Sequence, residues 1–83
     1  MLFCYDPPED VSFWMKDVSI PLDMIFIDEN DEVFKVYHAE PNSEKQIIVR
    51  DVAYVLEVND NSGIKRGDIL ELENNTPTMK VLF

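Results

Sequence analysis

The sequence is poor in the residues that most chemistry needs: it has one cysteine, one histidine and two glycines among 83 residues. One cysteine excludes an internal disulfide, and a single Cys and a single His are too few for a structural zinc site. Seven basic residues stand against 17 acidic ones, which gives a formal charge of -10. A surface of this charge repels phosphate backbones, so direct contact with nucleic acid is not expected.

Long apolar runs are also absent, and no window has the length that a membrane span requires. No basic region followed by an apolar stretch begins the chain, so we expect synthesis in the cytoplasm and no membrane partner. No cofactor motif is present, because a phosphate loop needs more glycine followed by Lys and Ser or Thr. The lone Cys4 sits in the apolar run Leu2–Tyr5 and is expected to be a buried thiol.

The remaining composition predicts one all-β domain over residues 1–83. The apolar fraction of 46% is that of a folded chain, and no segment keeps a helical apolar period with caps. We predict a small barrel of about six short strands. Runs with strand character are Leu2–Tyr5, Leu22–Ile27, Val33–Ala39, Ile47–Val49, Ala53–Asn59, Ile69–Glu73 and Met79–Phe83.

Residues 12–27 form the centre of the chain and hold its only tryptophan. Ile20-Pro21 divides this stretch into two extended pieces, because proline fixes φ and lacks an N–H. In the second piece Leu22, Met24 and Phe26 share one face, and Asp23, Ile25 and Ile27 share the other. Both faces are mostly apolar, which predicts a strand with little solvent on either side.

Three breaks between strands have a structural interpretation. Pro7-Pro8 are expected to forbid regular strand pairing over residues 6–10. Residues 28–32 imitate the start of a calcium loop, but they lack its glycine, so we predict a hairpin and no metal site. Gly63 and Gly67 with Asp68 predict a corner, in which Gly67 takes a positive φ and the Asp68 carboxylate accepts backbone N–H groups.

Two blocks of the sequence form a recognisable pattern. They are Phe13-Trp14-Met15-Lys16 with Ile20-Pro21-Leu22-Asp23 and Phe26, then residues 54–59 with Gly63-Ile64 and Gly67-Asp68. Together they resemble a bacterial and archaeal family, the domain of unknown function 192 (DUF192). The resemblance implies a small β-rich barrel and no known reaction. Compared with the family the chain lacks an N-terminal strand, so we expect an edge of the barrel to be open.

Asp23 is the one charged residue of its strand and therefore needs a partner or a function. The structural interpretation pairs it with Lys16, Arg50 or backbone N–H groups. In the functional alternative the barrel mouth binds a small polar ligand, or the protein is a weak hydrolase. The residues of that alternative site are Trp14, Lys16, Asp17, Asp23 and His38, although Trp14 alone is more typical of a core.

Catalysis by a nucleophile has only one candidate pair, Cys4 and His38, and nothing in the sequence shows that they meet. The scarcity of such groups favours a non-enzyme. We therefore expect a non-catalytic interaction or structural module of a larger assembly, with a virus or phage virion as one setting. Its partner is a protein, either a second copy or another chain, and it contacts the chain ends at Leu2, Phe3, Val81 and Phe83.

Overall fold

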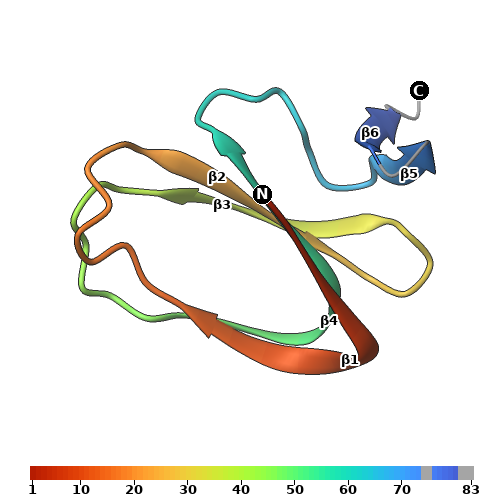
Figure 1. Ribbon diagram of the computed structural model, residues 1–83, viewed down its shortest axis with the longest axis horizontal. Helices are drawn as coiled ribbons and strands as arrows, with labels where there is room; N and C mark the ends of the chain where they lie inside the picture. The colour runs from red at the N-terminus through yellow and green to blue at the C-terminus, as the bar shows by residue number, and fades with distance from the viewer. Residues whose placement is uncertain (74–75, 81–83) are drawn as a thin grey trace.

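The computed structural model describes residues 1–73 and 76–80, with side chains up to residue 71. It is all-β, as the sequence predicts, and has six strands arranged in two antiparallel sheets (Figure 1). Within the described residues no helix is present, and hence none that is long and apolar enough to cross a membrane. The strands are β1 (Leu2–Phe13), β2 (Leu22–Ile27), β3 (Val33–Ala39), β4 (Ile47–Asn59), β5 (Ile69–Glu73) and β6 (Thr76–Lys80).

Four strands form one curled sheet in the order β1-β4-β2-β3, and β5 pairs with β6 in a second sheet. The curled sheet is barrel-like but does not close, because β1 and β3 are its two edges and are not paired with each other in the described structure. At one end the gap is bridged by loops. The N–H of Met15 donates to the Ser43 carbonyl (3.1 Å), and that of Asn42 donates to the Val18 carbonyl (2.9 Å).

β2 is buried on both faces, which confirms the prediction from its two apolar stripes. Met24 and Phe26 pack inside the curl with residues of β1 and β4. Ile25 and Ile27 pack outside it, against Leu70 at the start of the second sheet. Phe26, Ile25 and Ile27 each have an exposed fraction of 0%. Because neither face meets water, β2 is the part of the molecule around which the other strands are arranged.

β1 and β4 are longer than predicted, because irregular pairing replaces the expected breaks. Pro7-Pro8 do not end β1; the register jumps from Cys4 opposite Tyr54 to Glu9 opposite Val52, so regular pairing fails there without the strand ending. Arg50-Asp51 likewise do not separate two strands. Asp51 has a φ of 54°, and its N–H donates to the Asp10 carboxylate (3.1 Å), which holds a bulge inside β4.

The corner before β5 has the predicted geometry. Gly67 has a φ of 96°, and the Asp68 carboxylate accepts the Lys65 N–H at 2.9 Å. The backbone of Val33 exchanges hydrogen bonds with this corner: its N–H donates to the Asp68 carbonyl (2.8 Å), and its carbonyl accepts the Gly67 N–H (2.8 Å). The corner therefore attaches the second sheet to the beginning of β3.

Two further predictions about single segments are wrong. Cys4 is exposed and unpaired, because it lies on the outer face of an edge strand rather than in the core. The last strand was predicted over Met79–Phe83, whereas the last described strand runs over Thr76–Lys80, and Thr76 and Pro77 are already paired with β5. Val81 and Phe83 lie outside the described residues.

Candidate functional site

Asp23 lies at the beginning of β2, and its carboxylate is buried, with an exposed fraction of 1%. Its side chain belongs to the outer face of the sheet, where it meets β3 and the segment that follows β4. The register places Asp23 opposite His38 on β3 and opposite Val58 on β4. This position at the centre of three strands brings together residues that are far apart in the sequence.

The carboxylate of Asp23 has a complete set of partners. Its Oδ1 lies 2.7 Å from Nδ1 of His38, and since a carboxylate only accepts, Nδ1 carries the hydrogen. Its Oδ2 accepts both the N–H (3.1 Å) and the hydroxyl (2.9 Å) of Ser62. In the part of the chain whose side chains are described, no buried side-chain N or O atom lacks a hydrogen bond.

These bonds decide the charge state of Asp23. Burial alone would raise the pKa of the carboxyl, but the hydrogen bonds from the His38 ring and from the Ser62 backbone and hydroxyl outweigh it, and the pKa lies below its ordinary value. Asp23 is therefore ionised at neutral pH. The carboxylate holds the His38 ring in one orientation, while 76% of the His38 side chain stays exposed to water.

The predicted site residues form two groups rather than one. Asp23 and His38 are in contact, as described above. Trp14 and Lys16 form the second group, in which Nζ of Lys16 lies 5.3 Å from the centre of the Trp14 ring. No hydrogen bond or ion pair in the described structure joins the two groups. Of the partners predicted for Asp23, a backbone N–H is confirmed, that of Ser62, whereas Lys16 and Arg50 form no bond with it in the described structure. Asp17 is an exposed turn residue with a φ of 63°.

Trp14 is on the surface, so the core position considered as its alternative is wrong, and its role in binding stays a prediction. Its exposed fraction is 52%, whereas that of the next residue, Met15, is 1%. Ile48 of β4 is opposite Ser12, two residues before Trp14, and has an exposed fraction of 61%. Trp14, Lys16 and Ile48 are called the Trp14 surface below.

The other sequence-predicted residues are separate from both groups. Cys4 is on β1 opposite Tyr54, whereas His38 is on β3, so the four-strand sheet places them on opposite edges. Leu2 and Phe3 are partly covered by their own chain, and the Phe3 ring lies 5.6 Å from the Phe13 ring. Their burial by a second chain stays a prediction.

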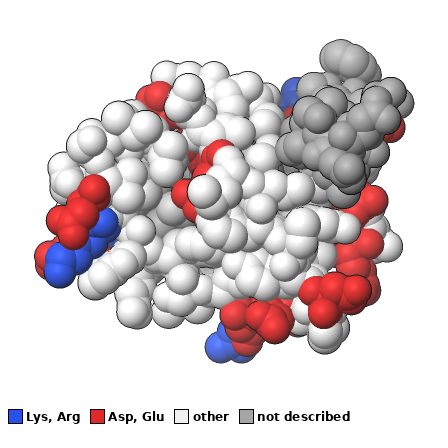
Figure 2. Space-filling view, viewed as in Figure 1, with Lys and Arg blue, Asp and Glu red and all other residues white. Residues whose placement is uncertain are grey.

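Carboxylates gather at one end of the molecule, over the β2–β3 hairpin and the bend of β1 and β4 (Figure 2, lower right). A pocket of about 460 Å³ at this end is lined by Asp28, Glu29 and Asp51 together with Pro8 and Asn30. Asp28 also supports the hairpin, because its Oδ1 accepts the N–H groups of Asn30 and Glu32. Among the described residues no group of three His, Cys, Asp or Glu side chains could hold a metal ion.

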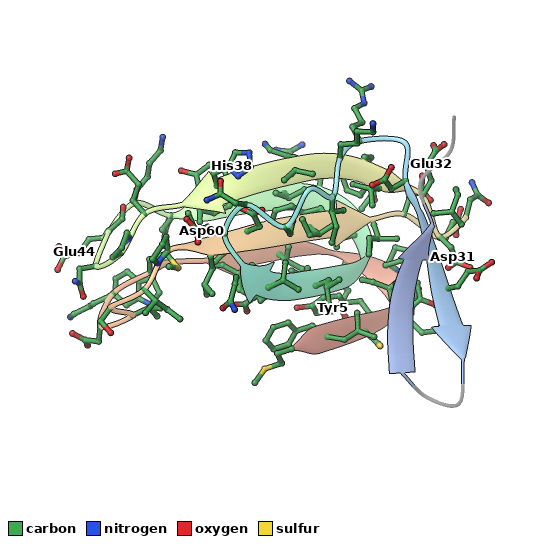
Figure 3. All side chains as sticks on the ribbon, turned by 90° about the horizontal axis from the view of Figure 1, so that it is seen from above. Tyr5, Asp31, Glu32, His38, Glu44 and Asp60 are labelled. Carbon is green, nitrogen blue, oxygen red and sulfur yellow. The ribbon has the colours of Figure 1, made fainter. Side chains whose placement is uncertain are left out.

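Two tyrosines have raised pKa values, with burial as the largest cause in both. Burial raises the pKa of Tyr54, and the charges of Asp31 and Asp6 and the Cys4 side chain add to it. Burial also raises the pKa of Tyr5, with Glu9 and Glu57 acting in the same direction. In Figure 3 Asp31 and Glu32 lie toward the acidic end, and His38, Glu44 and Asp60 lie toward the other. An anionic ligand is disfavoured at the acidic end.

Ser62 is the residue of this site that the sequence did not indicate. It belongs to the polar run Asp60-Asn61-Ser62, which has the composition of an ordinary loop. Its distance of 39 positions from Asp23 means that only the strand order brings the two together. The carboxylate on an apolar strand is the one signal that a buried donor had to exist somewhere.

Comparisons with known proteins agree with this fold. The model of the family DUF192, described as an uncharacterized ACR, matches residues 1–72. A protein of unknown function from Novosphingobium aromaticivorans is 35% identical, with a TM-score of 0.78. A Sinorhizobium meliloti protein described as a "putative transcription regulator" is 39% identical, with a TM-score of 0.75. Each match covers 86% of this chain, which spans 55% and 60% of the two solved chains. No curated protein matches.

Proposed function

The chain belongs to the DUF192 family, and we propose that this member is a non-catalytic binding domain whose Trp14 surface contacts a partner protein in a larger assembly. One observation carries the proposal: Trp14 and Ile48 have exposed fractions of 52% and 61%, and Ile48 pairs with Ser12, two residues before Trp14. Large apolar side chains grouped in water mark interaction surfaces, and tryptophan is among the residues that contribute most to binding energy at interfaces.

The outward position of Trp14 is fixed by its neighbours. Met15 is buried, and its N–H bonds to the Ser43 carbonyl, so the backbone on either side of it is held in place. Lys16 covers one part of the Trp14 ring by a cation–π contact and leaves the rest of the ring in water. A ring that is already oriented loses little conformational entropy on binding, which favours affinity.

The charge of the chain indicates the kind of partner. Two copies would bring together two chains of charge -10, and this repulsion disfavours self-association. The proposed partner is therefore a different protein, with an apolar centre for Trp14 and Ile48 and basic residues at the rim. Lys16 adds one positive charge to the Trp14 surface, but the chain as a whole has 17 acidic residues and is strongly negative.

Two settings are compatible with such a contact. The Sinorhizobium meliloti neighbour is described as a "putative transcription regulator"; for this chain we propose a contact with protein rather than with DNA, because its charge repels phosphates. The second setting is a virion, which was named from the sequence as one example, and it stays a prediction. No described residue distinguishes it from other assemblies.

The single tryptophan of the chain gives a direct test. Proteins retained from native lysate by the immobilised full chain are identified and purified, and each is titrated against the free chain. The Trp14 emission should shift to shorter wavelength on binding, and acrylamide should quench it less. A complex in which Trp14 stays as accessible to acrylamide as in the free chain would overturn the proposal.

Variants locate the contact within the surface. Ile48→Ser should weaken binding at least tenfold without loss of folding, because the side chain is already in water in the free domain. Ile20→Ser is the matched control, since Ile20 is similarly exposed at 53% but lies six residues from Trp14. Equal losses in both variants would place the contact elsewhere, and light scattering would show whether the bound species is instead a second copy.

A further inference from the structure

A small pocket beneath the segment that joins β3 to β4 is lined by opposite charges. Its volume is about 180 Å³, and Glu40 and Lys45 line it together with His38. The other lining residues are Met15, Tyr37, Ser43 and Ile47. This pocket is distinct from the Trp14 surface, whose exposed side chains do not line it.

The two charges do not neutralise each other. No ion pair joins Glu40 to Lys45 in the part of the chain with described side chains, so their charged atoms are separated by more than the 4.0 Å of a salt bridge. Neither side chain has another hydrogen bond or ring contact. Opposite charges that line one cavity without pairing are complementary to a ligand with both an ammonium and a carboxylate group.

The other residues that line the pocket restrict the kind of ligand further. Met15 and Ile47 also line the pocket and are buried, with exposed fractions of 1% and 5%. The Ser43 hydroxyl oxygen accepts the Lys45 N–H at 3.2 Å, so its own hydrogen remains available to a ligand. His38 is held in place by the buried carboxylate of Asp23. One wall is therefore fixed before a ligand arrives.

The size of the pocket favours a small ligand. Its volume of about 180 Å³ suits a molecule of a few non-hydrogen atoms. We infer that this pocket binds a small zwitterion of the size of a free α-amino acid, with its ammonium at Glu40 and its carboxylate at Lys45. The small contact area predicts weak, millimolar binding.

The test is an amide chemical-shift titration of the ¹⁵N-labelled full chain with L-alanine, which has six non-hydrogen atoms. Propionate and ethylammonium, at equal ionic strength, are matched probes that lack the ammonium or the carboxylate. L-Alanine should give saturable shifts at Met15 and over residues 37–47. Half of the maximum shift should be reached at a concentration at least tenfold lower than with propionate or with ethylammonium. Equal binding of propionate or ethylammonium, or no saturable shifts with L-alanine, would overturn the inference.

Charge variants test the assignment of each end. Lys45→Gln and Glu40→Gln should each weaken L-alanine binding at least tenfold, whereas Lys35→Gln should not, because Lys35 is an exposed lysine of β3 outside the pocket. The double variant Glu40→Lys with Lys45→Glu should restore binding with the ligand reversed. If Lys35→Gln weakens binding as much as Lys45→Gln, the effect is one of overall charge and the proposed site is wrong.

Discussion

Two aspartates of this small domain are equally buried, at 1% exposure, and are held in opposite ways. Asp68 is stabilised locally: its carboxylate accepts the N–H of Lys65, three residues earlier in the same turn. Asp23 is stabilised by residues that are 15 and 39 positions away, His38 and Ser62. The first arrangement depends on a turn, and the second depends on the complete strand order.

The difference shows which features of the fold each carboxylate supports. Asp68 belongs to the corner that joins β3 to β5, and its removal leaves one backbone N–H without its acceptor. Asp23 connects β2, β3 and the segment after β4, and its removal leaves three donors without their acceptor. A hydrogen bond to a charged group contributes about 1.5–3 kcal/mol, so the aspartate with three such bonds should matter more.

The largest effect is expected for Asp23→Ala. We predict that it lowers the free energy of unfolding by about 3 kcal/mol, because His38 and Ser62 lose their common acceptor. Urea denaturation measures this effect. Asp60→Ala is the matched control, since the Asp60 side chain is exposed and has only a long bond to Asn61 (3.4 Å); it should change stability by less than about 0.5 kcal/mol. Similar losses in both variants would show that Asp23 is not a special position.

Gly67→Val should cause the next largest loss of stability. A β-branched side chain is strongly disfavoured at a φ of 96°, and we expect a loss of about 2 kcal/mol. No atom lies within 4 Å of the position that a Cβ would take, so the whole cost is backbone strain. Gly67→Asn should lose less, because asparagine tolerates positive φ better. Equal urea midpoints for these two variants would contradict the requirement for a positive φ at Gly67.

Acid should weaken the Asp23 contacts. The pKa of this carboxyl is lowered in the folded protein from an ordinary 3.8, so its contribution is fully present above that value and is lost as pH falls through the folded pKa. Melting temperatures should therefore decrease below about pH 4 more steeply for the wild type than for Asp23→Asn, which cannot titrate. Parallel curves for the two proteins would show that the carboxylate gains nothing from its partners.

The smallest effect is expected for His38→Ala, at about 1 kcal/mol. It removes one of the three donors to Asp23, and a side chain that is 76% exposed contributes little by burial. Water can reach the freed oxygen from the position of the ring. Thermal melts check the value, and a loss as large as that of Asp23→Ala would mean that His38 rather than Ser62 carries most of the stabilisation.

Local features of the fold could be predicted from the sequence. The double burial of β2 follows from two apolar stripes in a six-residue strand, and the corner follows from Gly67-Asp68, because periodicity and turn chemistry act over a few residues. The bulges at Pro7-Pro8 and Arg50-Asp51 were predicted as ends of strands. A break in pairing has the same local pattern whether the chain then turns away or continues, and the strand opposite it decides which.

The candidate site could be predicted only in part. Asp23 was recognised because a carboxylate on an apolar strand requires partners, but Ser62 has no feature that distinguishes it from other loop serines. For Trp14 the sequence left a binding site and the core as alternatives, and alternation around the buried Met15 places it outside the core. Which face of a chain segment is buried depends on the strands that cover it, and that information is not local.

The most direct test of the whole account is the affinity of Asp23→Asn for the partner protein, measured at a temperature at which circular dichroism shows the variant to be fully folded. Asp23 is assigned to the support of the fold and the Trp14 surface to binding. We therefore predict wild-type affinity for Asp23→Asn, and at least a tenfold loss for Trp14→Ala with an unchanged melting temperature. A tenfold loss in fully folded Asp23→Asn, with Trp14→Ala binding normally, would contradict this assignment.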